Sequence, residues 1–262
     1  NECASATNII PAPPTAACIS PIQVSTAGAT ASPNPPACAT ASHLNDDLWY
    51  SFTATTPSHK LVITNTTNLL TGSNANMGYA LYAASCPASG TSLICAGSSG
   101  SGSASVNLTG LTVGTLYYLR LWSFDLNNYA GFKFCLLEIP LNNECSGAVN
   151  IPVTNGFCTT PVQGTLSTAT ISAGFGPPAC NLTASGADVW YKVTVPATGN
   201  FIVQTSAINT TVSNLLMEAY TGVCGSLSLL SCDDDGNPET FPSANHARIG
   251  ITGRTPGEVL YF

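Results

Sequence analysis

The sequence is poor in charged side chains, and in basic ones above all. Asp, Glu, Lys and Arg make up 7% of its 262 residues, whereas globular domains carry about 25%. Six basic residues against 13 acidic ones give a net charge of −7. Because contacts with nucleic-acid phosphates need clustered Lys or Arg, we expect no nucleic-acid partner. Binding to an anionic membrane surface is disfavoured for the same reason.

Long apolar runs and catalytic motifs are also missing. No run approaches the roughly 18 residues of a membrane-spanning helix, so we expect no membrane insertion. No Cys-x-x-Cys pair occurs, and His43, His59 and His246 are scattered, which excludes a Cys/His zinc knuckle. We interpret these histidines as solvated surface residues. The His-Glu-x-x-His and Gly-x-Ser-x-Gly motifs are absent and no pair of acids stands out, so the sequence predicts no catalytic residue and no enzyme.

Helical periodicity is absent too, and short alternating segments take its place. Polarity comes from Ser, Thr, Asn and Gly, which suit strands and turns. The predicted strands are separated by turn signals and lie around Trp49 and at residues 60–64, 78–82, 105–108, 116–122 and 132–137. We expect the strand at 60–64 to be the hairpin partner of the Trp49 strand. This pattern is typical of an antiparallel β-sandwich with Greek-key or jelly-roll topology.

The sequence contains two copies of the same domain. The acidic turn and strand around Trp49 return around Trp190, and Asn1-Glu2-Cys3 returns as Asn143-Glu144-Cys145. The offset at the tryptophans is 141 residues (190 − 49), which is the size of a domain rather than of a solenoid repeat.

We therefore predict an all-β chain of two tandem sandwiches, residues 1–140 and 141–262. The counterparts of residues 120–137 do not follow Phe262, so we expect the second domain to lack its last strand. An open sheet edge cannot persist alone, and we expect either that the chain continues or that a neighbouring chain donates the strand. The start without Met or a signal sequence is interpreted as a trimmed extracellular segment.

Aromatic side chains recur at matching strand positions in the two copies. Alternation places Leu48, Tyr50 and Phe52 on one face of the first strand and Trp49 on the other. Residues that recur in this way are interpreted as packing the sandwich rather than as a sugar-stacking platform; they are Trp49, Trp190, Tyr82 and Tyr220. Trp122 has no counterpart and is the candidate surface residue for binding a carbohydrate.

Eleven cysteines in a chain poor in lysine indicate disulfides and an oxidising compartment. The short spacings favour local bridges, each spanning a short hairpin or loop, and we expect the pairs Cys86–Cys95, Cys224–Cys232, Cys18–Cys38 and Cys158–Cys180. That choice leaves Cys3 for Cys135 and Cys145 for a residue beyond the end. The four cysteines of the first domain outside the hairpin allow three pairings, so this assignment stays open.

The densest acidic cluster is Asp233-Asp234-Asp235, followed by Gly236. Carboxylates in a Gly turn could hold Ca²⁺, the one cofactor that the sequence suggests, although the ligand spacing of an EF-hand is lacking. The alternative is a solvated acidic turn. Asp47 and Asp188 precede the repeated tryptophans, and we interpret them as acceptors of backbone N–H groups rather than as metal ligands.

Taken in order, the Asn-Glu-Cys start, the Asp-Leu-Trp-Tyr-Ser-Phe-Thr strand, the Leu-Tyr strand and the Cys-Asp-Asp turn resemble a known module. This is the Cys-rich β-sandwich repeat of large secreted surface adhesins in gliding bacteria that use type IX secretion. It is similar in turn to the pre-peptidase C-terminal domain. The first copy departs from the pattern, because Ala96-Gly97 stands where the family often has Asp-Asp.

The resemblance implies a secreted, non-catalytic, cell-surface module of an adhesin or filament. Its expected partners are neighbouring copies of the same module, joined by strand donation, and surface glycans. The alternative hypothesis is a carbohydrate-binding appendage of a secreted hydrolase.

Overall fold

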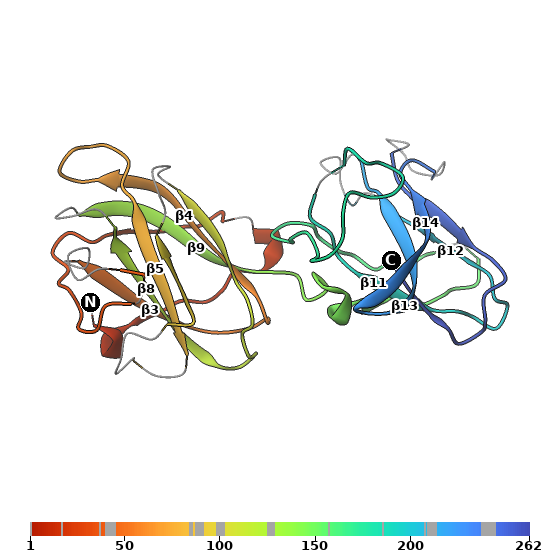
Figure 1. Cartoon of the computed structure of the whole chain (residues 1–262), viewed down its shortest axis with the longest axis horizontal. Coiled ribbons are helices and arrows are strands. Elements are labelled where there is room, and N and C mark those ends of the chain that lie inside the picture. Colours follow the sequence, from red (N-terminus) through yellow and green to blue (C-terminus); the bar gives the residue numbers. More distant parts are fainter. Residues whose placement is uncertain are drawn as a thin grey trace. The chain divides into compact units, whose positions relative to one another are not determined.

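The structure is a computed structural model. It describes residues 2–16, 18–36, 38–39, 46–83, 86, 92–97, 103–124, 129–156, 158–184, 186–206, 208, 214–236 and 245–262. The chain forms two compact units, Asn1–Ile139 (unit 1) and Pro140–Phe262 (unit 2). Strands dominate both units (Figure 1). In the described residues, no helix has the length and apolar character needed to cross a bilayer.

Unit 1 is a jelly roll. Its strands are β1 (Thr7–Asn8), β2 (Ile22–Ser25), β3 (Asp47–Thr53), β4 (His59–Asn68), β5 (Met77–Ala83), β6 (Ile94–Gly97), β7 (Ala104–Leu108), β8 (Leu116–Ser123) and β9 (Ala130–Glu138), with 3-10 turns η1 (Cys3–Ser5) and η2 (Pro14–Ala16). One sheet has the order β1-β3-β8-β5-β6 and the other β2-β9-β4-β7. Pairing is antiparallel except for the short β1, which runs parallel to β3. Apart from the β5–β6 hairpin, consecutive strands from β2 to β9 alternate between the two sheets, as in the double Greek key.

The expected hairpin between the Trp49 strand and residues 60–64 is wrong. The strand β3 pairs with β8 along its whole length, whereas β4 pairs with β7 and β9 in the other sheet. The Pro57-Ser58 turn therefore crosses from one sheet to the other. The strands β3 and β4 therefore lie in different sheets, face to face across the core rather than side by side.

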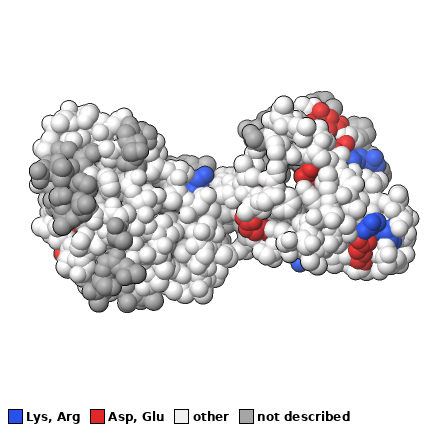
Figure 2. Space-filling model, in the orientation of Figure 1, with Lys and Arg blue, Asp and Glu red and all other residues white. Residues whose placement is uncertain are grey.

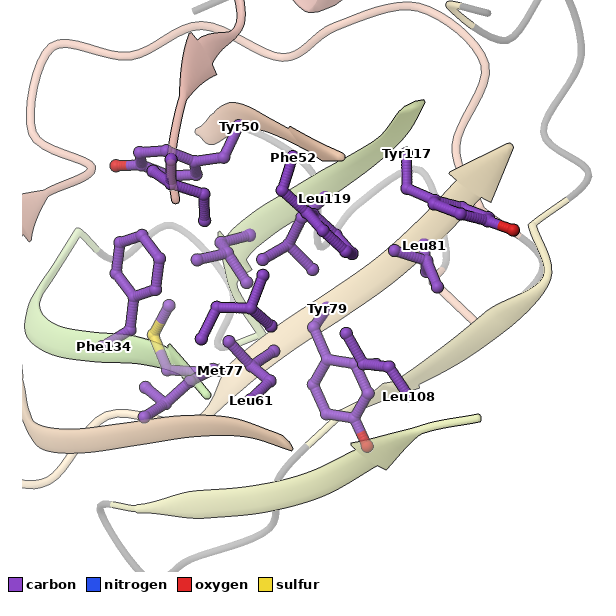
Figure 3. Packing of buried hydrophobic residues seen from close by; sticks show 14 of the residues in the cluster. Tyr50, Phe52, Leu61, Met77, Tyr79, Leu81, Leu108, Tyr117, Leu119 and Phe134 are labelled. Atoms are coloured by element: carbon purple, nitrogen blue, oxygen red, sulfur yellow. The ribbon is translucent and has the colours of Figure 1, made fainter. Parts of the chain in front are cut away.

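The main core of unit 1 fills the space between its two sheets. Tyr50 and Phe52 of β3 face inward and meet Leu61 of β4 and Phe134 of β9, all buried (Figure 3). Tyr50 and Phe134 have ring centroids 4.7 Å apart. The predicted alternation of β3 is thus confirmed, because the even-numbered side chains of this strand reach the intersheet core.

A second apolar cluster lies on the opposite face of the β3–β8–β5 sheet, under the N-terminal loops. It contains Trp49, Tyr82 and Trp122, and the ring centroids of Trp49 and Tyr82 are 5.4 Å apart. The prediction that Trp122 is a surface residue is wrong, because its side chain is fully buried. Gly78, its partner on β5, makes the space: a Cβ at that position would come within 2.1 Å of the indole ring.

Unit 2 repeats the first sheet and part of the second. Its elements are η4 (Cys145–Gly147), β10 (Val149–Asn150), β11 (Tyr191–Thr194), β12 (Phe201–Gln204), β13 (Met217–Val223), β14 (Ser226–Asp233), β15 (Arg248–Ile251) and β16 (Val259–Tyr261). The sheet β10-β11-β16-β13-β14 corresponds to the first sheet of unit 1, and β12 pairs with β15. A core around Val193, Ile249 and Leu260 lies between them.

The five disulfides follow a long-range pattern, and every expected pairing is wrong. The bridges are Cys3–Cys86, Cys18–Cys135, Cys38–Cys95, Cys145–Cys224 and Cys180–Cys232, whereas Cys158 is a free, exposed thiol.

Strand register explains the error in the two expected hairpin bridges. On β6, Cys95 stands opposite Ala80, six positions before Cys86 (86 − 80), so Cys86 and Cys95 cannot meet. In unit 2, Cys232 stands opposite Glu218, six positions before Cys224 (224 − 218). The strand cysteines instead reach the loops that cover the sheet, where Cys38 and Cys180 lie.

The Cys38–Cys95 bridge fastens a covering loop to an edge strand, so its removal should release that loop. In the double variant Cys38→Ser/Cys95→Ser, we expect the free energy of unfolding of unit 1 to fall by about 2–5 kcal/mol. Denaturant unfolding followed by tryptophan fluorescence measures this loss. Cys158→Ser is the matched control, since its thiol is free, and it should leave both units unchanged. Unaltered unfolding of the double variant would contradict the assigned pairing.

Candidate functional site

A buried ion pair lies at the centre of the outer face of β3 and β8. Trp49 and Arg120 are cross-strand partners, and Asp47 lies two residues earlier on the same face of β3. The Arg120 Nε donates to Asp47 Oδ2 at 2.8 Å, and both side chains are fully buried. The guanidinium carbon also lies 5.1 Å from the centroid of the Trp49 ring, in cation–π contact.

The ion pair is completed by the loop that precedes β3. Arg120 donates to the carbonyls of Asn34 (2.9 Å) and Ser32 (3.0 Å). The backbone N–H of Ser32 donates to Asp47 Oδ1 (2.7 Å), and the Ser32 hydroxyl accepts a hydrogen bond from the indole N–H of Trp49 (2.9 Å). We call Asp47, Arg120, Ser32 and Trp49 the buried brace. Because its charged groups are partnered by the protein itself, the brace fixes a loop and offers no open face to a substrate.

Unit 2 repeats the aspartate, the serine and the tryptophan of the brace. Asp188 Oδ1 accepts hydrogen bonds from the N–H and the hydroxyl of Ser172, both at 3.0 Å. The Ser172 hydroxyl accepts the indole N–H of Trp190 at 2.7 Å. Burial raises the pKa of the Asp188 carboxyl above its ordinary value, and the Ser172 hydrogen bonds oppose that rise. The expectation that Asp47 and Asp188 accept backbone N–H groups is confirmed in both units.

Asp46, next to the brace, is a buried carboxyl with a different role. Its Oδ2 accepts a hydrogen bond from the Thr26 hydroxyl, and the same Thr26 oxygen accepts the backbone N–H of Ala130 at 2.9 Å. Burial raises its pKa to about 7, helped by the negative charge of Asp47 and opposed by the Thr26 hydrogen bond. Asp46 therefore links the covering loop to the start of β9.

Two of the three histidines are buried, so the surface interpretation is wrong for them. His59 is fully buried on β4, packs on the ring of Phe52 at 5.4 Å and lies 3.1 Å from the Thr55 hydroxyl. Burial lowers its pKa to about 4, so the ring is neutral at physiological pH. His246 is 1% exposed. His43 lies outside the described residues.

The acidic cluster supports a turn. Asp233 Oδ2 accepts the backbone N–H groups of Gly236 and Arg248, each at 2.8 Å. Asp234 Oδ2 accepts the side-chain amide of Asn181 at 3.0 Å, and Asp235 is exposed. Within the described ranges, no three His, Cys, Asp or Glu side chains gather as a metal site. The calcium expectation stays a prediction, since residues 237–244 lie outside those ranges.

A concave surface lies on the outer face of β2, β9 and β4. This outer-face groove has a volume of about 590 Å³ and is lined by Gln23, Ser25, Asn65, Thr67, Leu69 and Lys133, among others. Its polar rows follow from register, because Lys133 pairs with Gln23 on one side and with Thr64 on the other. Charged side chains are sparse on the face of unit 1 that Figure 2 shows.

Two local features shape this groove. The pairing of β4 and β9 shifts register between Thr64 and Thr67, and Asn65 in that bulge has a φ of 53°, which Asn tolerates. Gly131 leaves room for Leu69, since a Cβ there would lie 3.2 Å from the leucine side chain. The Leu69 N–H donates to the backbone carbonyl of Tyr129. Tyr129 is 37% exposed and is the exposed aromatic residue among those that the structure describes.

The groove was not predicted from the sequence. Its residues come from strands that pair only in the folded unit, and outward-facing Gln, Ser, Asn and Thr carry no sequence signal of their own. The outward alternation of residues 129, 131 and 133 was the one available cue. It becomes informative only when the pairing of β2 with β9 is known.

Comparison with known proteins gives one family. A family model described as galactose binding domain-like, for domains associated with the type IX secretion system, matches residues 1–136 and 141–237. The two matched segments fall in unit 1 and unit 2 respectively. No curated protein matches the chain.

Breaking the buried brace should be costly, because it leaves a buried charge without its partner. We expect Asp47→Asn to lower the free energy of unfolding of unit 1 by about 3–5 kcal/mol, measured by chemical denaturation. Glu258→Gln is the matched control: it breaks the partly exposed Arg254–Glu258 pair of unit 2 and should change stability little. Equal effects of the two variants would contradict the structural role of the brace.

Asp46 predicts a pH dependence of unit 1. Its folded-state pKa of about 7 lies above the ordinary value of 3.8, so the folded state holds a proton that the unfolded state releases. The Asp46 contribution to stability is thus fully present below pH 4 and is lost as pH rises through about 7.

Asp46→Asn should remove this loss and be relatively more stable at pH 8 than at pH 5. The measurement is the difference in melting temperature between Asp46→Asn and the parent chain across this range. The difference also cancels the opposite effect of His59, whose lowered pKa makes stability rise with pH. A constant difference would contradict the prediction.

Proposed function

Since the chain belongs to the family of galactose-binding-like domains associated with type IX secretion, we propose that its two units are adhesion modules of a cell-surface adhesin or filament. A galactose-binding-like domain is a non-catalytic binding module. The family and the five disulfides point to a secreted or cell-surface protein, because such bridges persist in oxidising surroundings.

The buried brace is the observation that carries this proposal. Asp47 and Arg120 form the one fully buried ion pair among the described residues, and this pair holds a loop in place. The repeated tryptophans Trp49 and Trp190 donate their N–H groups to loop serines rather than line a cleft. Side chains that could do chemistry thus serve the scaffold, which favours mechanical and adhesive roles.

The adhesin repeat and pre-peptidase resemblance of the sequence supports the same proposal. In such a tandem, partners are neighbouring modules or copies, and strand donation is the expected mode of association. Low surface charge and long-range cross-links suit a protein exposed to proteases outside the cell.

A second candidate function is carbohydrate binding, and the outer-face groove favours it. The groove combines amide and hydroxyl side chains with the apolar Leu69, next to exposed Tyr129, which is the mixture that a sugar ring meets in binding proteins. The family description is consistent with this candidate. It replaces Trp122, whose burial removes it from any ligand.

A glycan array tests both candidates at once. We expect the chain to be retained on galactose-containing or related surface glycans without releasing soluble sugar. Lys133→Ala and Tyr129→Ala should each weaken that retention about tenfold, the equivalent of about 1.4 kcal/mol, because the first removes a side chain that lines the groove and the second removes the exposed ring of the residue bonded to Leu69.

Lys192→Ala, on β11 of unit 2, is the matched control and should bind like the parent chain. If neither groove variant changes the retention, the glycan does not bind at the outer-face groove. Release of sugar from the array would contradict a non-catalytic module.

A further inference from the structure

Strand register places the outward side chains of β2, β9 and β4 in two rows across the outer-face groove. One row is Gln23, Lys133 and Thr64, and the other is Ser25, Gly131 and Thr67. Each row spans two interstrand spacings, which is about 10 Å. The second row has no side chain at its middle position, so the surface is hollow between the Ser25 and Thr67 hydroxyls.

At the start of β9, an aromatic ring, this hollow and a cation follow one another on the outer face. Tyr129, Gly131 and Lys133 are each two residues apart, so neighbours among them are separated by about 7 Å. Leu69 lies against Gly131 and gives the hollow an apolar wall. Hydroxyl and amide side chains surround it on the other sides. The hollow therefore offers an apolar surface to the C–H face of a sugar ring and polar partners to its hydroxyls.

Lys133 is the charged side chain in this groove, and the described lining residues include no Asp or Glu. The ion pairs of the described chain join Arg120 to Asp47 and Arg254 to Glu258, and none of them involves Lys133. Its cross-strand partners are uncharged on both sides. A chain with six basic residues thus places one of them beside a sugar-sized hollow, without a described carboxylate to neutralise it.

An ammonium group in this position favours an anionic ligand over a neutral one. The lysine side chain has three donors and no acceptor, so it can donate to a sugar hydroxyl or to an anion. A hydrogen bond between charged groups is roughly twice as strong as one between neutral groups. Physiological salt screens exposed charges beyond about 8 Å, so the net charge of −7 does not cancel this local attraction.

We propose that the outer-face groove binds an acidic sugar, whose ring lies at Gly131 and whose carboxylate or sulfate group pairs with Lys133. This inference rests on the carbohydrate-binding candidate of the proposed function and names its ligand class. Lysine is a compact point charge without the planar pair of donors that arginine presents. Carboxylate and sulfate therefore share the chemistry that the site recognises.

Four oligosaccharides of equal length test the proposal on the full chain. They are a galacturonate oligomer, its methyl ester, a galactose oligomer and a sulfated galactose oligomer. Isothermal titration calorimetry should show that a charged oligomer binds about tenfold more tightly than its neutral counterpart. Added salt should reduce this difference, because it screens the charge. The two charged oligomers show which anionic group the site takes.

Lys133→Gln should abolish the preference for the charged oligomer and leave the affinity for the neutral one unchanged, because it removes the charge and keeps a polar side chain. Lys133→Arg should retain the preference. Lys60→Gln is the matched control: Lys60 lies on the same face of β4, about 13 Å from Thr64, and does not line the groove. It changes the net charge equally and should bind all four oligomers like the parent chain.

Gly131→Ala tests the place of the ring separately from the charge. Its Cβ would lie 3.2 Å from the Leu69 side chain and would narrow the hollow. We expect the affinities for charged and neutral oligomers to fall together, because both lose room for the same ring.

Equal affinities for charged and neutral oligomers would overturn the proposal, and so would equal losses in Lys133→Gln and Lys60→Gln. In either case, binding of the neutral oligomer leaves the carbohydrate-binding candidate standing. If none of the four oligosaccharides binds, that candidate fails together with this inference. The adhesion role of the two units does not depend on any of these outcomes.

Discussion

The contact between Arg120 and Asp47 is the constraint on which much of unit 1 depends. Two buried charges stabilise a fold only when their geometry is good and their remaining hydrogen bonds are satisfied. Arg120 meets that condition only if the chain at residues 32–34 returns over the outer face of β3 and β8. The same return buries Trp122 and brings Cys38 to Cys95. The covering loop, the second apolar cluster and one disulfide therefore share a single cause.

Local rules predicted the strands and their faces. Alternation along β3 placed Tyr50 and Phe52 in the intersheet core, and the repeat of Asp47 and Trp49 as Asp188 and Trp190 predicted a repeated polar contact. These features depend on the sequence within one strand and its adjoining turn. The preference of a carboxylate for backbone N–H groups holds wherever the loop comes from, which is why this prediction succeeded without knowledge of the partner.

Long-range pairing could not be predicted in the same way. A short separation lowers the entropic cost of closing a loop, and this favoured the Cys86–Cys95 bridge and the hairpin after β3. The jelly roll overrides that preference: it sends β3 and β4 to different sheets, and the β5–β6 register sets Cys95 opposite Ala80. The outer-face groove was missed for the same reason, because β2, β4 and β9 are distant in sequence. Trp122 was misplaced because its burial needs both Gly78 and the covering loop.

The two copies of the Cys-x-x-Pro segment show where the strand information resides. The segments after Cys18 and Cys158 both continue as Pro, a β-branched residue and Gln, yet only the first forms a strand. The segments then differ, because Gly164 stands where the first has Val24, and Gly weakens a strand. The partner differs as well, because β9 lies beside the first segment and no described strand lies beside the second. Strand propensity measures the fit to a pleated neighbour more than a property of the residue itself. The Pro, β-branched and Gln pattern therefore does not make a strand by itself, and in unit 1 the pairing with β9 and the apolar Val24 complete it.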